Sequence, residues 1–268
     1  MSVDDKPYIA KDYWDKRYDK LSIDRSGHVD LPAEYNSWLY KRKRACIHGL
    51  LRKAGVSLSK ARVLEMGAGT GVYVADWVKA GADVTGIDMS VKAAEALQIK
   101  YPDHKFFQAD LTDPGLSSRL GPPYDLVTGI DVLYYLTDDT GWQRTLRMVH
   151  DALRLEGYFI IIEQFRHGDV RDHGYIKWRS LDAYTKVLTE AGFEIIDLVP
   201  AFFTMVQVCD TEPRALCAFL DRAWERTYPW MERIPKVMGP LAYAIDTILG
   251  TFLSEGPSME VMLCRKTG

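Results

Sequence analysis

The feature that most constrains the fold is a regular alternation of short apolar runs and amphipathic segments after residue 60. The apolar runs predict strands over residues 61–66, 83–88, 105–108, 124–130, 157–163, 193–199 and 260–265. The amphipathic segments between them predict helices over residues 71–80, 90–101, 139–155 and 179–191. Strands that alternate with helices in this way are typical of an α/β domain with a mostly parallel sheet.

Two regions lie outside this alternation. Residues 1–55 contain a predicted helix over 34–53, and a helical, aromatic-rich stretch comes just before the last strand. We therefore expect one domain over the whole chain. Its parts are an N-terminal helical cap over residues 1–55, an α/β core over 56–208 and 259–268, and a helical lid insertion over 209–258.

Composition narrows the classes of function. The 268 residues are 47% apolar and 26% charged, as in ordinary globular proteins, and the net charge is −3. A chain with this charge has no overall positive field to attract a nucleic acid, so we expect no nucleic-acid partner. The four cysteines have no paired spacing, which is typical of reduced thiols in a cytoplasmic protein.

No membrane span is expected either. The first residues are charged and lack the apolar centre of a signal peptide. The most apolar late stretch, residues 237–253, is interrupted by Gly239, Pro240 and Asp246 and is shorter than the roughly 20 apolar residues of a spanning helix. We expect a cytoplasmic protein that is a monomer or a homodimer.

A glycine-rich turn joins the first predicted strand to its helix. It contains Glu65, Gly67, Ala68, Gly69 and Gly71. Glycines allow a ligand to approach the backbone closely, and the helix that follows directs its amide groups toward that ligand. In dinucleotide-binding enzymes a third glycine would fall where this chain has valine, and the carboxylate at the strand end would repel a pyrophosphate. A cationic nucleoside without phosphates fits this turn better.

Acidic residues also stand at or just after the ends of the next three predicted strands. They are Asp88, Asp110 and Asp131. In an open α/β sheet, ligands bind at the carboxyl ends of the strands. The carboxylate of Asp88 can accept hydrogen bonds from both hydroxyls of a ribose, and Asp110 can accept one from an adenine amino group.

The segments VLEMGAGTG, VTGIDMS, FFQADL and YDLVTGIDVLYYL occur in that order between about residues 60 and 135. Together they resemble the class I S-adenosylmethionine (SAM)-dependent methyltransferases. The resemblance implies a doubly wound, Rossmann-like sheet of seven strands with the last strand antiparallel. It also implies SAM, S-adenosyl-L-methionine, as the methyl donor and S-adenosyl-L-homocysteine as its product.

The resemblance implies roles for individual residues. In the glycine-rich turn, Glu65 and Gly71 are expected at the cofactor, and Gly67, Ala68 and Gly69 are expected to lie against the methionine part of SAM. Asp88 is expected to bind the ribose and Met89 to pack on the face of the adenine. Asp110 and Leu111 are expected at the edge of the adenine, and Ile130 near the sulfonium. The segment YWDKRY, which ends at Tyr18, is similar to the opening of many small-molecule members, whose first helices close over the donor. Tyr18 is therefore expected at the cofactor.

The chain departs from many members after the fourth strand. They have a histidine at the position of Tyr134 or Tyr135, so no histidine role is transferred to that position. We expect these two tyrosines to shape the substrate pocket. Candidates for a general base come from the loop after the fifth strand, which contains His167 and His173. Histidine has an unperturbed pKa of about 6.5 and can act as a neutral base.

That loop has other interpretations. It can be a polar surface loop without a chemical role, and its two histidines and two aspartates have no spacing typical of a metal site, so no metal is predicted. The run Lys41-Arg42-Lys43-Arg44 before the glycine turn can be a solvated face, or Arg42 or Arg44 can reach the carboxylate of the donor.

The aromatic residues of the insertion, among them Trp230, also allow several interpretations. They can be ordinary core, or they can form an apolar lid whose inner face meets the acceptor, and in that case Trp230 belongs to the substrate pocket. A dimer face or a peripheral membrane contact would use the same residues.

The favoured function is the transfer of a methyl group from SAM to an oxygen or nitrogen atom of a small organic molecule. The chain lacks the Asn/Asp-Pro-Pro-Tyr/Phe tetrad that marks many enzymes that methylate bases and amides. Three alternatives stay open. They are a non-catalytic or repurposed SAM-binding protein, a methyltransferase that acts on a glycan- or lipid-linked acceptor, and a nicotinamide oxidoreductase.

Overall fold

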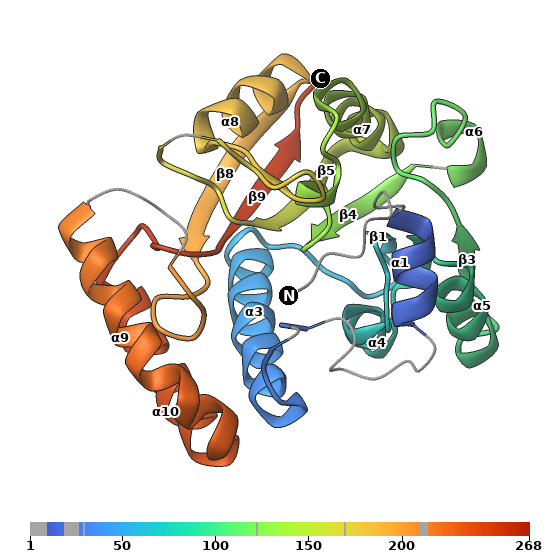
Figure 1. Ribbon diagram of the computed structural model, residues 1–268. Coiled ribbons are helices and arrows are strands. Elements are labelled where there is room, and N and C mark those ends of the chain that lie inside the picture. The colour runs from blue at the N-terminus through green and yellow to red at the C-terminus, as the bar shows by residue number, and fades with distance from the viewer. Residues whose placement is uncertain (1–9, 19–26, 29, 122, 169, 209–213) are drawn as a thin grey trace.

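A seven-stranded sheet forms the centre of the molecule (Figure 1). Its strands are β1 (Arg62–Met66), β2 (Asp83–Asp88), β3 (Lys105–Gln108), β4 (Tyr124–Ile130), β5 (Leu153–Glu163), β8 (Phe193–Pro200) and β9 (Glu260–Lys266). The structure is a computed structural model and describes residues 10–18, 27–28, 30–121, 123–168, 170–208 and 214–268.

The strands follow the order β3-β2-β1-β4-β5-β9-β8. The first five run parallel, and β9 is antiparallel to both β5 and β8. The direction of winding reverses between β1 and β4, and ligands of such sheets bind at the carboxyl ends of the strands beside this point. The predicted doubly wound sheet with an antiparallel last strand is confirmed.

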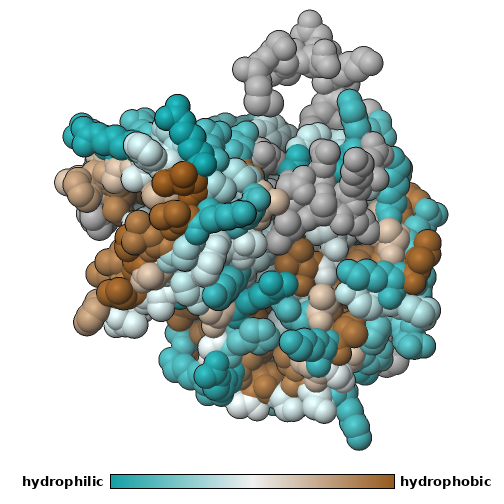
Figure 2. Space-filling view, turned by 90° about the horizontal axis from the view of Figure 1, so that it is seen from below, coloured by the Kyte–Doolittle hydropathy of each residue, from teal (hydrophilic) through white to brown (hydrophobic). Residues whose placement is uncertain are grey.

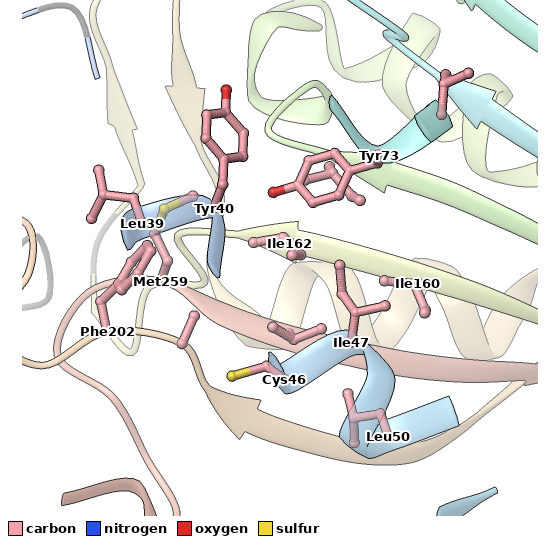
Figure 3. Close-up of a cluster of buried hydrophobic side chains, with 14 of the residues drawn as sticks. Leu39, Tyr40, Cys46, Ile47, Leu50, Tyr73, Ile160, Ile162, Phe202 and Met259 are labelled. Carbon is pink, nitrogen blue, oxygen red and sulfur yellow. The ribbon is translucent and has the colours of Figure 1, made fainter. Parts of the chain in front are cut away.

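Helices cover both faces of the sheet because successive strand residues point to opposite sides. The helices on the core are α3 (Ala33–Lys53), α4 (Val72–Lys79), α5 (Val91–Lys100), α6 (Ser117–Leu120), α7 (Asp139–Ala152) and α8 (Leu181–Glu190). Ile160 of β5 lies in one buried cluster with residues of α3 and α4, and Ile161 lies in a second cluster with residues of α7 and α8. Figure 3 shows the first cluster, with Ile47 and Leu50 of α3.

Local signals set the starts of two of these helices. The side-chain oxygens of Ser90 and Ser180 accept hydrogen bonds from the backbone N–H groups of Ala93 (3.3 Å) and Ala183 (3.1 Å), so both predicted caps are confirmed.

One predicted boundary is wrong. The helix expected to reach residue 155 ends at Ala152, and β5 begins at Leu153, four residues before the predicted start. Leu153 pairs with Tyr124 of β4 and is buried. An irregularity at Glu156, whose φ is +60°, then lets the strand continue.

The cap and the insertion lie on one side of the sheet (Figure 1). The described cap consists of α1 (Ala10–Arg17) and α3, and the described insertion consists of α9 (Arg214–Arg233) and α10 (Pro235–Phe252). Only Ile234 separates α9 from α10, and the pair forms a helical hairpin beside α3. Gly239 of α10 leaves room for the Trp38 ring, since a Cβ atom there would lie 2.3 Å from that ring.

Two short elements near the sheet edge carry candidate site residues. They are a 3₁₀ turn over Leu133–Tyr135 and a small hairpin of β6 (Arg171–Asp172) and β7 (Lys177–Trp178). Among the helices that the structure describes, none is long and apolar enough to cross a membrane.

Candidate active site

A two-lobed cavity lies at the carboxyl ends of the parallel strands. The larger lobe has a volume of about 500 Å³ and the smaller one about 90 Å³. Five residues line both lobes, namely Trp14, Tyr18, Gly67, Asp131 and Tyr135. The lobes therefore adjoin one another at these five residues, where the reversal of strand order predicts a ligand site.

The glycine-rich turn forms part of the wall. Gly67 and Gly69 have φ angles of +68° and +51°, in the left-handed region that favours glycine. A Cβ atom on Gly67 would lie 2.7 Å from the side chain of Val132, and one on Gly69 would lie 3.0 Å from the hydroxyl of Tyr18. Glycine at both positions thus lets other residues, or a ligand, come close to the backbone.

Asp88 lies at the end of β2 and lines the smaller lobe. Its two oxygens accept hydrogen bonds from the backbone N–H groups of Gly69 and Ser90, each at 2.8 Å. Burial raises the pKa of Asp88 to about 6, and these hydrogen bonds act against that rise. The carboxylate is thereby held rigidly at the edge of the cavity.

The other walls of the smaller lobe are mainly apolar. They include Met89, Ala109, Leu111, Val132 and Leu136. A buried carboxylate beside an apolar slot suits a ribose that carries a flat, uncharged base, so these residues fit the nucleoside part of SAM.

Helix α1 covers the junction of the two lobes. The ring centroid of Trp14 lies 5.4 Å from that of Tyr18 and 5.1 Å from that of Tyr135. Asp15 ties this helix to the core, because it accepts a hydrogen bond of 2.7 Å from the hydroxyl of Ser90. The structure thus places Tyr18 at the cavity, and its contact with the cofactor stays a prediction.

Four of the residues expected at the cofactor are not among those that line the cavity, namely Glu65, Gly71, Asp110 and Arg42. The carboxylate of Glu65 is buried and accepts hydrogen bonds from Trp77 and Thr128, and burial raises its pKa to about 7. Gly71 caps α4 behind the turn. The side chain of Asp110 accepts hydrogen bonds from its neighbour Thr112 and is exposed, while Leu111 beside it lines the smaller lobe.

Asp131 is the central polar residue of the site. It directly follows β4, and its φ of +54° is unusual for a residue other than glycine. One carboxylate oxygen forms an ion pair with the ammonium of Lys43, which is 7% exposed. The other oxygen, Oδ1, is buried and has no hydrogen-bond partner among the described residues. Strained, incompletely bonded polar residues are typical of functional sites.

The side chain of Glu163 holds the segment after Asp131 in place. Its carboxylate accepts hydrogen bonds from the backbone N–H groups of Leu133 (2.9 Å) and Tyr134 (3.3 Å). Tyr134 and Tyr135 of this segment line the larger lobe, as does Ile130 before it. Burial raises the pKa of Tyr134 well above its usual value, so its phenol stays protonated.

The two candidate bases separate in the structure. His173, the first residue of the turn between β6 and β7, lines the larger lobe, and its ring packs edge-on against Trp178 at 5.3 Å. His167 is not among the residues that line either lobe. Among the described residues, no group of three or more His, Cys, Asp or Glu side chains is arranged to hold a metal ion.

Two expectations need correction. The guanidinium of Arg42 points away from the cavity and donates to the backbone carbonyls of Pro200, Ala201 and Asp246, at 3.0–3.4 Å. It therefore joins α3 to α10 and does not reach the donor. Trp230 is 53% exposed on α9 and is absent from the cavity lining, because the other face of that helix packs inward, with Trp224 and Met231.

The sequence interpretation missed Lys43 as a site residue. Asn36, Leu39, Tyr40 and Lys43 all line the larger lobe, and their spacing of three, four and seven residues places them on one face of α3. That spacing is the signal that identifies this face. The hydroxyl of Tyr73 and Oε1 of Gln164, both on lobe-lining residues, also have no described hydrogen-bond partner.

Comparisons with known proteins agree with this geometry. A family model described as a methyltransferase domain matches residues 38–198. A protein from Geobacillus sp. (strain WCH70) that is named as a methyltransferase is 29% identical over 159 residues. The match covers 57% of this chain and 56% of that relative, so the chain spans little more than half of the relative's length.

Solved structures share the fold. Magnesium protoporphyrin IX methyltransferase from Synechocystis PCC 6803, with bound SAM, aligns over 100% of both chains at 16% identity and a TM-score of 0.58. The 1,6-didemethyltoxoflavin-N1-methyltransferase of Burkholderia thailandensis, with 1,6-didemethyltoxoflavin and S-adenosylhomocysteine bound, aligns over 85% of this chain and 79% of its own. Its identity is 19% and its TM-score 0.53.

The resemblance found in the sequence motifs is confirmed, and SAM is the cofactor of the family that it indicates. Because the family model matches more than half of the residues and the sheet has the class I topology, the chain belongs to the methyltransferase domain family, as a class I SAM-dependent member.

Proposed function

We propose that this chain transfers a methyl group from SAM to an oxygen or nitrogen atom of a small organic molecule. The observation that carries the proposal is the position of Asp131, which lines both lobes of the cavity and has one buried oxygen without a described partner. The smaller lobe would take the edge of the SAM nucleoside beside Asp88, and the larger lobe would take the methionine part of SAM at Ala68 and Gly69 together with an acceptor.

When bound, SAM supplies a methyl group on a positively charged sulfur. The protein's task is to align the acceptor atom with that methyl group and to exclude water from the junction. Trp14, Tyr18 and Tyr135 line both lobes and surround this point with aromatic rings. The cofactor would be held by the Gly67–Gly69 turn, Asp88 and Met89.

Asp131 is positioned to act on the acceptor. Lys43 occupies its Oδ2, and Oδ1 is left to accept a hydrogen bond or a proton from a hydroxyl or amine of the acceptor. Such proton acceptance raises rates by about 10²- to 10⁴-fold. His173, on the same lobe, is our second candidate for the base, and the two are separated by substitution below.

The size of the larger lobe favours a small acceptor. Its volume of about 500 Å³ lies within the range of small-molecule sites, which is roughly 300–1,000 Å³. The side chains around it include hydrogen-bonding groups such as Tyr73 and Gln164 as well as apolar groups such as Leu39 and Phe202. This mixture suits an organic molecule with a few polar substituents.

The proposal is tested with SAM that carries a labelled methyl group and with fractionated metabolite extracts. We expect at least one fraction to yield a labelled small molecule with the wild-type protein and very little with Asp131→Asn. Calorimetry with SAM alone runs in parallel. A protein that binds SAM in calorimetry and labels nothing in any fraction would be a SAM-binding protein without transferase activity, and the proposal would be rejected.

A further inference from the structure

Helix α10 exposes an apolar face to solvent. Val237, Leu241, Ile245, Ile248 and Phe252 are spaced three or four residues apart and are 58%, 51%, 39%, 59% and 83% exposed. From Val237 to Leu253 the single charged residue is Asp246, which is buried. A surface helix normally carries charged residues on its exposed side, so this apolar face is suited to contact with another apolar phase or surface.

Helix α9 adds a different chemistry to the same hairpin. Phe219, Arg222, Arg226, Trp230 and Arg233 are all exposed and follow one helical face at spacings of three or four residues. The exposed acidic residues of this helix are Glu225 and Glu232. They lie about 100° around the helix axis from the centre of that face. This face therefore combines large aromatic rings with arginines, and Lys236 follows at the start of α10.

We call these two faces together the outer face of the hairpin. Figure 2 shows it as a band of brown side chains on the left, where Figure 1 places the hairpin, with teal side chains beside the band. Helices that lie in a membrane surface carry this combination of a continuous apolar face, tryptophan or phenylalanine, and flanking arginine or lysine.

Two possible occupants differ in their charge requirements. In a two-fold dimer the outer face of one copy meets the outer face of the other, so Arg222, Arg226 and Arg233 of both copies would be gathered in one interface. The outer face carries no acidic side chain among its described residues to neutralise them. Anionic lipid headgroups, in contrast, complement these arginines while the α10 face enters the boundary of the acyl chains.

We propose that the outer face of the hairpin docks the protein onto bilayer surfaces that contain anionic lipids. The hairpin adjoins the larger lobe through the side of α9 that points away from the outer face. On that side Gln207, a lobe residue, donates a hydrogen bond of 3.3 Å to Asp221, and the ring of His28, another lobe residue, lies 6.4 Å from that of Trp224. Docking would thus hold the acceptor lobe behind α9, about one helix diameter (~10 Å) from the membrane surface.

The test uses sedimentation of the 268-residue chain with phosphatidylcholine vesicles, with and without phosphatidylglycerol. We expect binding to the phosphatidylglycerol vesicles that weakens as salt is added. Arg222→Gln/Arg226→Gln should weaken it about 30-fold, since each basic residue near an anionic surface contributes roughly fivefold. Leu241→Glu/Ile248→Glu should abolish it, because two charges would enter the apolar boundary.

Control variants test whether a loss of vesicle binding could come from misfolding or from a general change in surface charge or hydrophobicity. Ile99→Glu changes an apolar side chain that is 82% exposed on α5, far from the hairpin in the chain, and Arg52→Gln removes one exposed charge from α3. Both should bind vesicles like the wild type. Far-ultraviolet circular dichroism should be the same for all variants.

Several outcomes would overturn the proposal. One is no binding to either kind of vesicle, and another is binding that Leu241→Glu/Ile248→Glu leaves unchanged. A third is a dimer in light scattering that this double variant converts to a monomer, which would assign the outer face to a second copy of the chain.

Discussion

The two lobes of the cavity are built in different ways. The smaller lobe comes largely from turns that directly follow β1, β2, β3 and β4. The larger lobe adds residues from α3, from the β6–β7 hairpin and from residues 202–208, which are far apart in the chain. A lobe formed by strand ends is a property of the fold, whereas a lobe formed by separate elements can vary between relatives. Ala68 and Gly69 of the cofactor turn line the larger lobe, so we expect SAM to occupy the smaller lobe and the adjoining part of the larger one. We expect acceptor choice to depend on the walls of the larger lobe that come from the separate elements.

The largest effect is expected from a change at Asp131, which should reduce the rate of methyl transfer and leave SAM binding nearly unchanged. Asp131→Asn keeps the size of the side chain but cannot accept a proton, so kcat should fall by about 10²- to 10⁴-fold. The affinity for SAM, measured by calorimetry, should stay close to that of the wild type. His173→Ala is the companion variant. If it abolishes turnover while Asp131→Asn remains active, the base is His173.

A large loss of stability is expected from Asp246→Ala. This buried carboxylate accepts hydrogen bonds from the backbone N–H groups of Phe203 (2.8 Å), Thr204 (2.8 Å) and Met205 (3.3 Å). Leaving these donors unpaired should lower the free energy of unfolding by about 3 kcal/mol or more. Urea titration measures the change, and Glu255→Ala, an exposed acid after α10, should shift it by less than about 0.5 kcal/mol.

The same variant sharpens the contrast between the lobes. Residues 203–205 connect Phe202 with Val206 and Gln207, which line the larger lobe only. Below its unfolding transition, Asp246→Ala should therefore raise the KM for the acceptor and leave SAM binding unchanged. Equal losses for both ligands would show that the lobes are not independent.

Smaller losses are expected within the cofactor lobe. Asp88→Asn should weaken SAM binding about 10- to 100-fold, because a charged hydrogen-bond acceptor becomes neutral. Asp110→Asn should change it less than about twofold, since that side chain is exposed and bonded to Thr112. Calorimetry on both variants checks this pair, and a large effect at Asp110 would restore its expected role at the adenine.

The smallest effect concerns pH. Burial raises the pKa of Asp88 to about 6, and the ionised form is the one that accepts ribose hydrogen bonds. SAM affinity should fall by up to about tenfold per pH unit below pH 6, and Asp88→Asn should remove this dependence. For the folding stability of the protein without ligand, the effect of pH has the opposite sign. The raised pKa stabilises the fold at acidic pH, and this contribution is lost as the pH rises from about 4 to 6.

Much of the fold and of the cofactor lobe is predictable from sequence because both are encoded locally. The apolar strands, the caps at Ser90 and Ser180 and the glycine turn each depend on residues close together in the chain. Asp88 and Met89 follow directly from the end of β2, so their position is set once the strand is recognised.

The run Lys41-Arg42-Lys43-Arg44 shows why the rest is not predictable in this way. Successive helix residues point about 100° apart, so four similar cations have four surroundings. Lys41 lies over the Trp38 ring at 4.2 Å, Arg42 bonds to carbonyls near α10, Lys43 enters the cavity and Arg44 pairs with Asp76. Those surroundings come from distant segments, and the sequence alone does not reveal how they pack around α3.

The bonds of Arg42 and Asp246 also bear on how specificity can be re-engineered. Deleting α9 and α10 would remove one hydrogen-bond acceptor of the buried Arg42 guanidinium. It would also remove the carboxylate that accepts hydrogen bonds from the backbone amides of residues 203–205. The insertion is therefore not a detachable module, although it lies at the periphery. A transplant of the hairpin from one relative into another would succeed only if the residue at position 42 and the segment after β8 are exchanged together with it.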